Sequence, residues 1–215
     1  MHEIFQHELK YYFKNKVEAI YLYSYFISII VLFPFAMRYD SGKLQELATI
    51  ALWIALASGI ALGAAPLFRR EAEQGRLDYF QLLPLSLEGI VAAKWAAFFL
   101  FITLPLLATL PIAGLLYNLS PHELGREAVG LIAGAAGLSI LSTLVAALTT
   151  GLEKAGSILS LIMLPLSIPL MVFGAAFCRS EGPFLQENLL FLAGFSLFML
   201  PVMCIAGAYS IRAGN

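Results

Sequence analysis

Long hydrophobic runs separated by short polar segments dominate the pattern of this sequence. Each run is long enough to cross a hydrocarbon layer of roughly 30 Å as a helix that rises about 1.5 Å per residue. The pattern predicts an all-α polytopic membrane protein that forms one transmembrane domain over residues 1–215. The six predicted spans lie near residues 17–37, 46–68, 90–117, 128–150, 157–177 and 189–211.

Residues 1–16, before the first run, are amphipathic rather than uniformly apolar. Aromatic and aliphatic side chains share one helical face, whereas polar ones, including Lys10 and Lys14, fall elsewhere. This pattern is typical of an interfacial helix that lies flat on a membrane with its lysines near the headgroups. A frayed polar tail is the alternative. The apolar face consists of Phe5, Leu9, Tyr12 and Phe13.

The longest polar interruption is the loop of residues 69–89, between the second and third runs. It also contains apolar residues at three-residue spacing, which places them on one side of a short helix. The loop is therefore interpreted as an amphipathic coupling helix that offers charge to the aqueous side, although a loop that merely rests on headgroups fits the pattern equally well. The apolar residues are Leu77, Phe80 and Leu83, and the charged ones are Arg69, Arg70, Glu71, Glu73, Arg76, Asp78 and Glu88.

Residues around the end of this loop predict where one helix stops and the next begins. Pro84 ends the short helix because it disfavours helical geometry in the residue before it. Ser86 can then cap the following helix, with Glu88 in its first turn.

Prolines and glycines inside the runs predict bends and close helix contacts. A proline is tolerated in a membrane helix where neighbours satisfy the freed carbonyl group, so each one predicts a bend inside a bundle. Small residues let helices approach closely, within the chain or between two copies, although glycine is common in membrane helices in any case. The predicted bends are at Pro105, Pro111, Pro165, Pro169 and Pro201, and the packing residues are Gly130, Gly134 and Gly137.

The basic residues that flank the runs predict the orientation. With six spans, both termini and the loop of residues 69–89 share one side, which holds nine lysines and arginines, whereas the other side holds four. The side with more positive charge faces the cytoplasm, so both termini and the loop are predicted to be cytoplasmic. The four on the other side are Arg38, Lys43, Arg126 and Arg179.

Charge is scarce, and its distribution excludes several classes of function. Only 13% of the residues are charged and the net charge is −1, so nothing points to nucleic acid. The middles of the runs contain no Asp, Glu, Lys, Arg or His, which weighs against a proton-coupled transporter or an ion channel. Lys94 lies at a span end, where its ammonium group can reach water. Cys178, Cys204 and the three histidines form no metal set, so no metal or cofactor is expected on this chain, and the two cysteines are expected to be small buried residues.

The sequence has no Walker-type glycine loop, so the energy for any transport must come from outside the chain. A cytoplasmic partner that pushes on the loop of residues 69–89 would rearrange the spans on either side of it.

These features resemble the membrane subunit of ABC-2-type exporters and, more narrowly, the haem exporter protein B (CcmB) family. Beyond the six spans, the resemblance rests on four stretches, of which the one with two prolines four residues apart before Phe173-Gly174 is the most specific. The four stretches are residues 32–36, residues 67–94 with Glu71, Glu73, Gly75, Leu77, Asp78, Leu83 and Pro84, residues 146–152, and residues 164–174.

The resemblance implies a non-catalytic permease subunit of an ABC transporter for cytochrome c maturation. Its implied partners are a cytoplasmic ATPase that carries ATP and docks on residues 69–89, and a haem-handling membrane protein, in a bacterial inner membrane. The apolar spans and their small-residue faces add membrane lipid and a second copy of the chain as candidate partners. ATP hydrolysis would drive delivery of haem or release of a haem-loaded chaperone. An exporter of a lipid, polysaccharide or drug, and a non-transporting scaffold, remain the alternatives.

Overall fold

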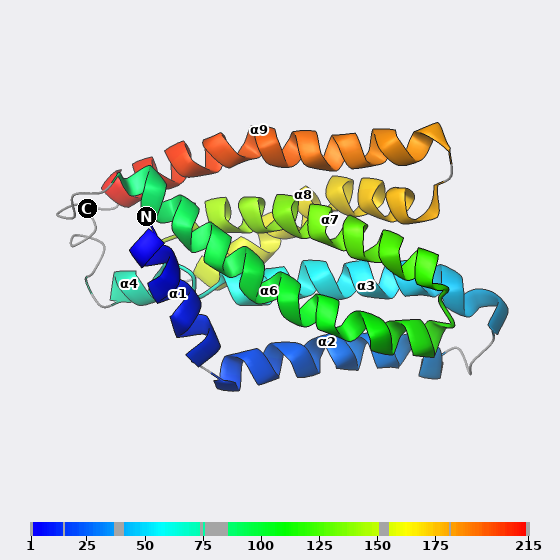
Figure 1. The fold of residues 1–215 in the computed structure, drawn as a ribbon. Coiled ribbons are helices and arrows are strands. Elements are labelled where there is room, and N and C mark those ends of the chain that lie inside the picture. Colours follow the sequence, from blue (N-terminus) through cyan, green and yellow to red (C-terminus); the bar gives the residue numbers. More distant parts are fainter. Residues whose placement is uncertain are drawn as a thin grey trace.

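The computed structural model describes residues 2–14, 16–36, 41–73, 75, 86–150, 155–180 and 182–213. Over these ranges the regular secondary structure is helical and contains no strand. Six long helices form a bundle, preceded by a short helix at the N-terminus (Figure 1). The long helices are α2 (Lys16–Ala36), α3 (Ser41–Ala64), α6 (Leu87–Tyr117), α7 (Pro121–Leu148), α8 (Ala155–Arg179) and α9 (Pro183–Ala213), and the short ones are α1 (His2–Lys14) and α4 (Arg69–Glu73).

The predicted all-α fold is confirmed. Each predicted span overlaps one of the long helices, and all six are apolar and long enough to cross a membrane. Hydropathy is a poor guide to helix ends, because a polar first turn is stabilised by capping rather than by lipid. For example, α7 begins at Pro121 rather than near residue 128, and Ser120 and Glu123 form a reciprocal capping box there. Ser86 caps α6 as predicted, accepting a 3.2 Å hydrogen bond from the Gly89 amide.

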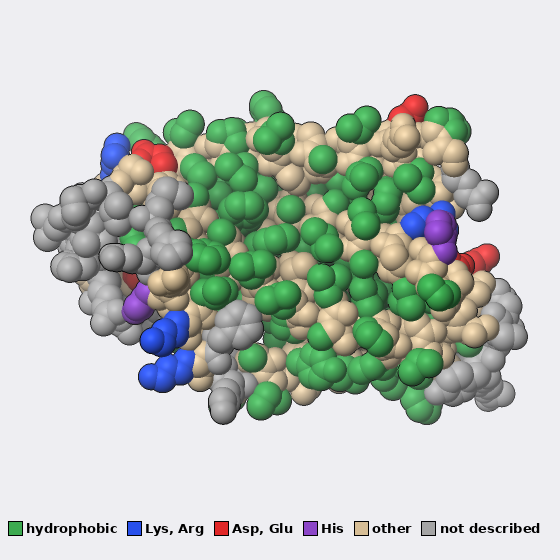
Figure 2. All heavy atoms as spheres, viewed as in Figure 1, with side chains coloured by type: hydrophobic (Ala, Val, Ile, Leu, Met, Phe, Trp, Pro, Cys, Tyr) green, Lys and Arg blue, Asp and Glu red, His purple; other side chains and the backbone are tan. Residues whose placement is uncertain are grey.

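Helix α7 is the centre of the bundle. It contacts α3, α6, α8 and α9, and 72% of its span is buried inside the protein. By contrast, only 11% of the α9 span is buried, so most of that helix faces outward. The face drawn in Figure 2 has apolar side chains over its wide middle and charged ones near its two ends, as expected of a protein that crosses a membrane.

Hydrogen bonds between helices supplement the apolar packing. The Tyr117 hydroxyl of α6 donates to the Ile30 carbonyl of α2 at 2.7 Å, and the Trp95 indole of α6 donates to the Ser139 hydroxyl of α7 at 2.9 Å. Such bonds replace contacts that lipid cannot supply to buried polar groups.

The three predicted packing glycines all lie against neighbouring helices of the same chain. A side chain at Gly130 would meet Cys178 and Phe177 of α8, one at Gly134 would meet Trp53 of α3, and one at Gly137 would meet Leu170 of α8. Close approach at these glycines therefore brings α7 against α3 and α8 within one chain.

The predicted bend prolines all lie inside helices rather than at their ends. Pro105 and Pro111 are in α6, Pro165 and Pro169 are in α8, and Pro201 is in α9. Each lacks the N–H that would bond the carbonyl group four residues earlier.

Candidate functional site: a buried lysine between α1 and α4

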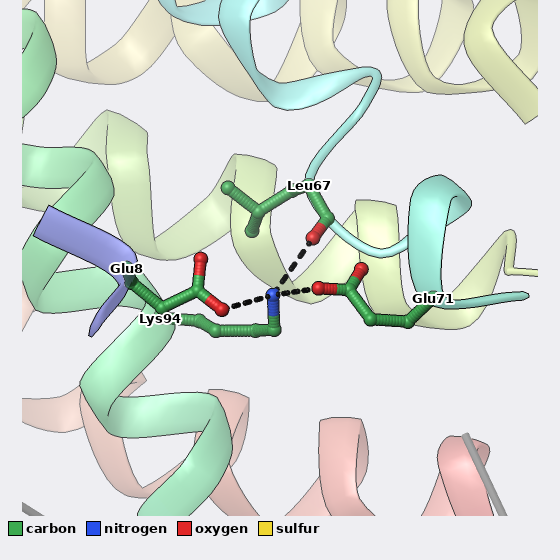
Figure 3. Close-up of polar contacts among 4 residues, drawn as sticks. All are labelled: Glu8, Leu67, Glu71 and Lys94. Atoms are coloured by element: carbon green, nitrogen blue, oxygen red, sulfur yellow. Dashed lines mark hydrogen bonds and ion pairs between the residues drawn. The ribbon is translucent and has the colours of Figure 1, made fainter. Parts of the chain in front are cut away.

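The start of α1, the end of α9 and α4 lie at the same end of the bundle (Figure 1). At that end the Lys94 side chain of α6 lies between α1 and α4, as Figure 3 shows. Its Nζ lies 3.0 Å from Glu8 Oε1 of α1, 2.5 Å from Glu71 Oε1 of α4, and 3.3 Å from the carbonyl oxygen of Leu67. These three acceptors match the three N–H donors of an ammonium group. One side chain of α6 thereby joins α1, α4 and the turn that precedes α4.

Because Lys94 is buried, its ammonium group depends on the acceptors that surround it. The Lys94 side chain is only 2% exposed, and those of Glu8 and Glu71 are 15% and 16% exposed. The Phe68 ring adds a cation–π contact, with Nζ 5.5 Å from its centroid. Because an ammonium group loses its hydration on burial, it is stable here only while the carboxylates and the carbonyl group compensate.

The turn between α3 and α4 fixes Glu71 in place. Leu67 and Phe68 are almost fully buried and anchor the turn to the bundle. The Leu67 amide donates to the Ala64 carbonyl, and the Ala72 amide donates to the Phe68 carbonyl, both at 3.1 Å. Helix α4 is therefore tied to the end of α3 as well as to Lys94.

Helix α1 packs against α6, which refines its prediction as an interfacial helix. Tyr12 is 7% exposed, and its ring stacks on that of Phe101 with centroids 4.5 Å apart. Ile4 and Phe5 also contact the core. Part of the apolar face of α1 is thus covered by protein rather than by lipid, and this contact places Glu8 beside Lys94.

The structure describes part of the predicted coupling segment. Arg69, Arg70, Glu71 and Glu73 form α4, and Gly75 follows with a left-handed φ of 62°. Glu71 points inward to Lys94 instead of outward to a partner. The remaining predicted coupling residues, Leu77, Asp78, Phe80, Leu83 and Pro84, lie outside the described residues, as does the predicted helix that contains them.

The prediction that Lys94 reaches water at a span end is wrong. The ammonium group is buried because two carboxylates from distant parts of the sequence approach it. Sequence reasoning placed Glu71 in the coupling segment but missed Glu8. The available signal was a lysine within an apolar stretch, which requires an acidic partner.

The bundle and its buried ion cluster show which class of protein this is. It is a polytopic helical membrane protein in which Lys94 of the third span forms an ion pair with Glu71, in the polar segment between the second and third spans. Residues 1–214 match the family model described as CcmB protein. The chain belongs to the CcmB family.

Several proteins named Heme exporter protein B are similar over most of their length. That of Paracoccus denitrificans is 34% identical over 191 residues, which cover 88% of each chain. That of Pseudomonas aeruginosa is 31% identical over 212 residues, covering 97% of this chain and 95% of the relative. That of Escherichia coli K12 is 33% identical over 173 residues, covering 80% and 79%.

Proposed function

We propose that this chain is the membrane subunit of an ABC transporter that exports haem for cytochrome c maturation, driven by a separate cytoplasmic ATPase. Membership of the CcmB family and the similarity to proteins named Heme exporter protein B support this assignment. The name of these relatives favours haem over a lipid, a polysaccharide or a drug as the compound that the complex handles. In this proposal ATP binds the partner subunit, and the complex rather than this chain alone handles haem.

The observation that carries the proposal is the contact of Lys94 with Glu71 and Glu8. An ATPase that moves residues 69–89 would also move α4, because α4 lies within that segment. The Lys94–Glu71 contact would pass this movement to α6, and the Lys94–Glu8 contact would pass it to α1. Such transmission requires short, buried contacts, because a solvated surface pair yields to side-chain motion.

In the proposed orientation, residues 69–89 and both termini face the cytoplasm of a bacterial inner membrane. The location of the termini and α4 at one end of the bundle is compatible with this arrangement, and the excess of basic residues at that end supports it. The haem-handling membrane protein and a second copy of the chain would contact outward-facing spans. The α9 span, of which 11% is buried, and the α2 span, of which 22% is buried, offer the most surface.

Two variants separate docking of the ATPase from transmission of its movement. Replacing Glu73 and Asp78 by lysine reverses charge on residues 69–89 and keeps Glu8, Glu71 and Lys94 as they are, so we expect the ATPase to be lost from detergent pull-downs. Glu71→Gln keeps the shape of the side chain but removes its charge, so we expect the ATPase to be retained while holocytochrome c falls. The proposal fails if the lysine variant retrieves the ATPase at wild-type yield with undiminished cytochrome c.

A further inference from the structure

A polar pocket lies at the other end of the bundle, away from the termini, where α3 and α7 begin and α8 ends. Its volume is about 420 Å³, within the range of roughly 300–1,000 Å³ that is usual for small-molecule sites. Its polar lining includes Glu46 and Thr49 of α3, Arg126 and Glu127 of α7, and Cys178 and Arg179 of α8. The contacts of Lys94 at the opposite end do not involve this pocket.

Two guanidinium groups of the pocket have no paired carboxylate among the residues that the structure describes. Arg126 Nη1 donates to the Ser180 carbonyl at 3.1 Å, and Arg179 Nη2 donates to the Glu46 carbonyl. The Nε of Arg126 is buried and has no hydrogen-bond partner. Neither arginine forms an ion pair within 4.0 Å of a carboxylate in the described part of the chain, although Glu46, Glu123 and Glu127 line the same pocket and both arginines act electrostatically on Glu127. Paired guanidinium groups with free donors favour a phosphate or carboxylate.

The two arginines favour a ligand with anionic oxygens, whereas Glu127 favours a ligand that carries a hydrogen-bond donor. Glu127 is only 4% exposed, and its Oε1 accepts a hydrogen bond from the Thr49 hydroxyl. Its Oε2 is buried without a hydrogen bond of good geometry, and the donor near it is the Cys178 thiol, a weak donor that also lies 4.0 Å from the Arg126 carbonyl oxygen. A buried carboxylate oxygen with only a weak donor nearby is unfavourable, so a stronger N–H or O–H donor from a ligand would stabilise it.

The ligand must therefore carry an anionic oxygen and a hydrogen-bond donor close together. Haem offers two carboxylates but no donor for Glu127, and like charges would repel. A metal ion does not fit either, because the described residues provide no group of three suitable ligands and the guanidinium groups would repel it. A phosphoethanolamine group meets both requirements.

An apolar groove of about 380 Å³ lies deeper along α3 and α8. It is lined by Ile54 and Ala61 of α3 and Met171 of α8, among other residues. One face of α3 leads from the pocket to the groove, because residues at four-residue spacing lie on the same side of a helix. This face carries Glu46 at the pocket, then exposed Ile50, and then exposed Ile54 at the groove. The rise from Glu46 to Ile54 is about 12 Å, which suits a polar head at the helix ends and an acyl chain below it.

We propose that this pocket binds the headgroup of phosphatidylethanolamine, with the phosphate at Arg126 and Arg179 and the amine donating to Glu127. The acyl chains follow the apolar face of α3 towards the groove. The proposal depends on neither the transported compound nor the ATPase.

Binding to the full chain in detergent tests the proposal. The protein is titrated with phosphatidylethanolamine in mixed micelles, and bound lipid is measured by native mass spectrometry. We expect R126Q/R179Q to bind at least about tenfold less tightly, because charge-assisted hydrogen bonds are lost. R212Q is the matched control, because it removes an exposed guanidinium group at the opposite end, and it should bind like the wild type.

Three further binding measurements test the role of the amine of the lipid and the role of the apolar groove. Phosphatidylcholine, which lacks an N–H donor, should bind about tenfold more weakly than phosphatidylethanolamine to the wild type. Glu127→Gln, which keeps an acceptor for Thr49, should abolish this difference without changing phosphatidylcholine binding, even if the arginine variant fails to fold. Ala61→Leu should weaken lipid binding by narrowing the groove, whereas Ala193→Leu on the outward face of α9 should not.

Equal binding of the two lipids by the wild type would overturn the proposal. The proposal would also be overturned if soluble glycerophosphoethanolamine competed at the same concentration as the lipid. The pocket would then bind a water-soluble ligand rather than a membrane lipid. If haem displaced the lipid from the wild type but not from R126Q/R179Q, that result would overturn the proposal and identify the ligand of the pocket as a dicarboxylate.

Discussion

Replacing Lys94 by methionine tests the buried ion cluster directly, because methionine keeps much of the volume but removes the ammonium group. Glu8 and Glu71 would remain with 15% and 16% of their side chains exposed and without a counterion. Removing one partner of a buried ion pair costs roughly 3–5 kcal/mol. Because both carboxylates retain some contact with water, we expect the lower end, about 3 kcal/mol of unfolding free energy.

A surface pair at the same end of the bundle provides the matched control. Arg212 and Glu88 lie 3.9 Å apart, with side chains 60% and 40% exposed. Exposed ion pairs contribute about 0–1 kcal/mol, so Arg212→Met should change stability by less than about 1 kcal/mol. A comparison of the two variants therefore isolates the effect of burial.

Denaturant unfolding in detergent, followed by tryptophan fluorescence, measures both variants. A further variant, K94M/E8Q/E71Q, removes the uncompensated charge and should recover most of the lost stability. If the buried cluster transmits movement from the ATPase, this recovered variant should still fail to mature cytochrome c. Equal unfolding midpoints for K94M and R212M would refute the reasoning about the cluster.

Two other predictions concern the spans. A side chain at Gly174 would collide with the ring of buried Trp53. Gly174→Ala should therefore lower the unfolding free energy by about 1–3 kcal/mol in the same assay. Gly194→Ala is the control, because its added methyl group meets nothing within 4 Å, and it should leave the unfolding free energy unchanged or raise it slightly. Replacing Pro165 and Pro169 of α8 by alanine should straighten that helix and lower the yield of holocytochrome c without preventing insertion. Unchanged yield in the double variant would show that the prolines are incidental.

The helices were predictable because a bilayer imposes a simple rule on composition. An apolar run of sufficient length forms a spanning helix whatever its neighbours, so each predicted run overlaps one of the six long helices. Caps were predictable where a local motif specifies them, as at Ser86. In contrast, the start of α7 at Pro121 was missed, because its first turns include polar residues that lower the local hydropathy.

The polar sites were less predictable because they depend on contacts between distant segments. Glu8 and Lys94 are 86 positions apart, and no periodicity within α1 distinguishes Glu8 from a solvated side chain. Glu127 lies one residue before the predicted fourth span, where it resembled an ordinary flanking charge. Only the packing of α3 and α8 against α7 shows that it is buried at the pocket.

The orientation of the coupling segment is the central claim that can be tested most directly. Arg69→Cys places a thiol at an exposed position of α4, and Glu187→Cys places one at an exposed position near the start of α9, at the opposite end of the bundle. Each variant is treated with a membrane-impermeant thiol reagent, in intact spheroplasts and in inverted membrane vesicles. The account predicts labelling of position 69 only in inverted vesicles and of position 187 only in spheroplasts. Labelling of position 69 from outside intact spheroplasts would contradict it.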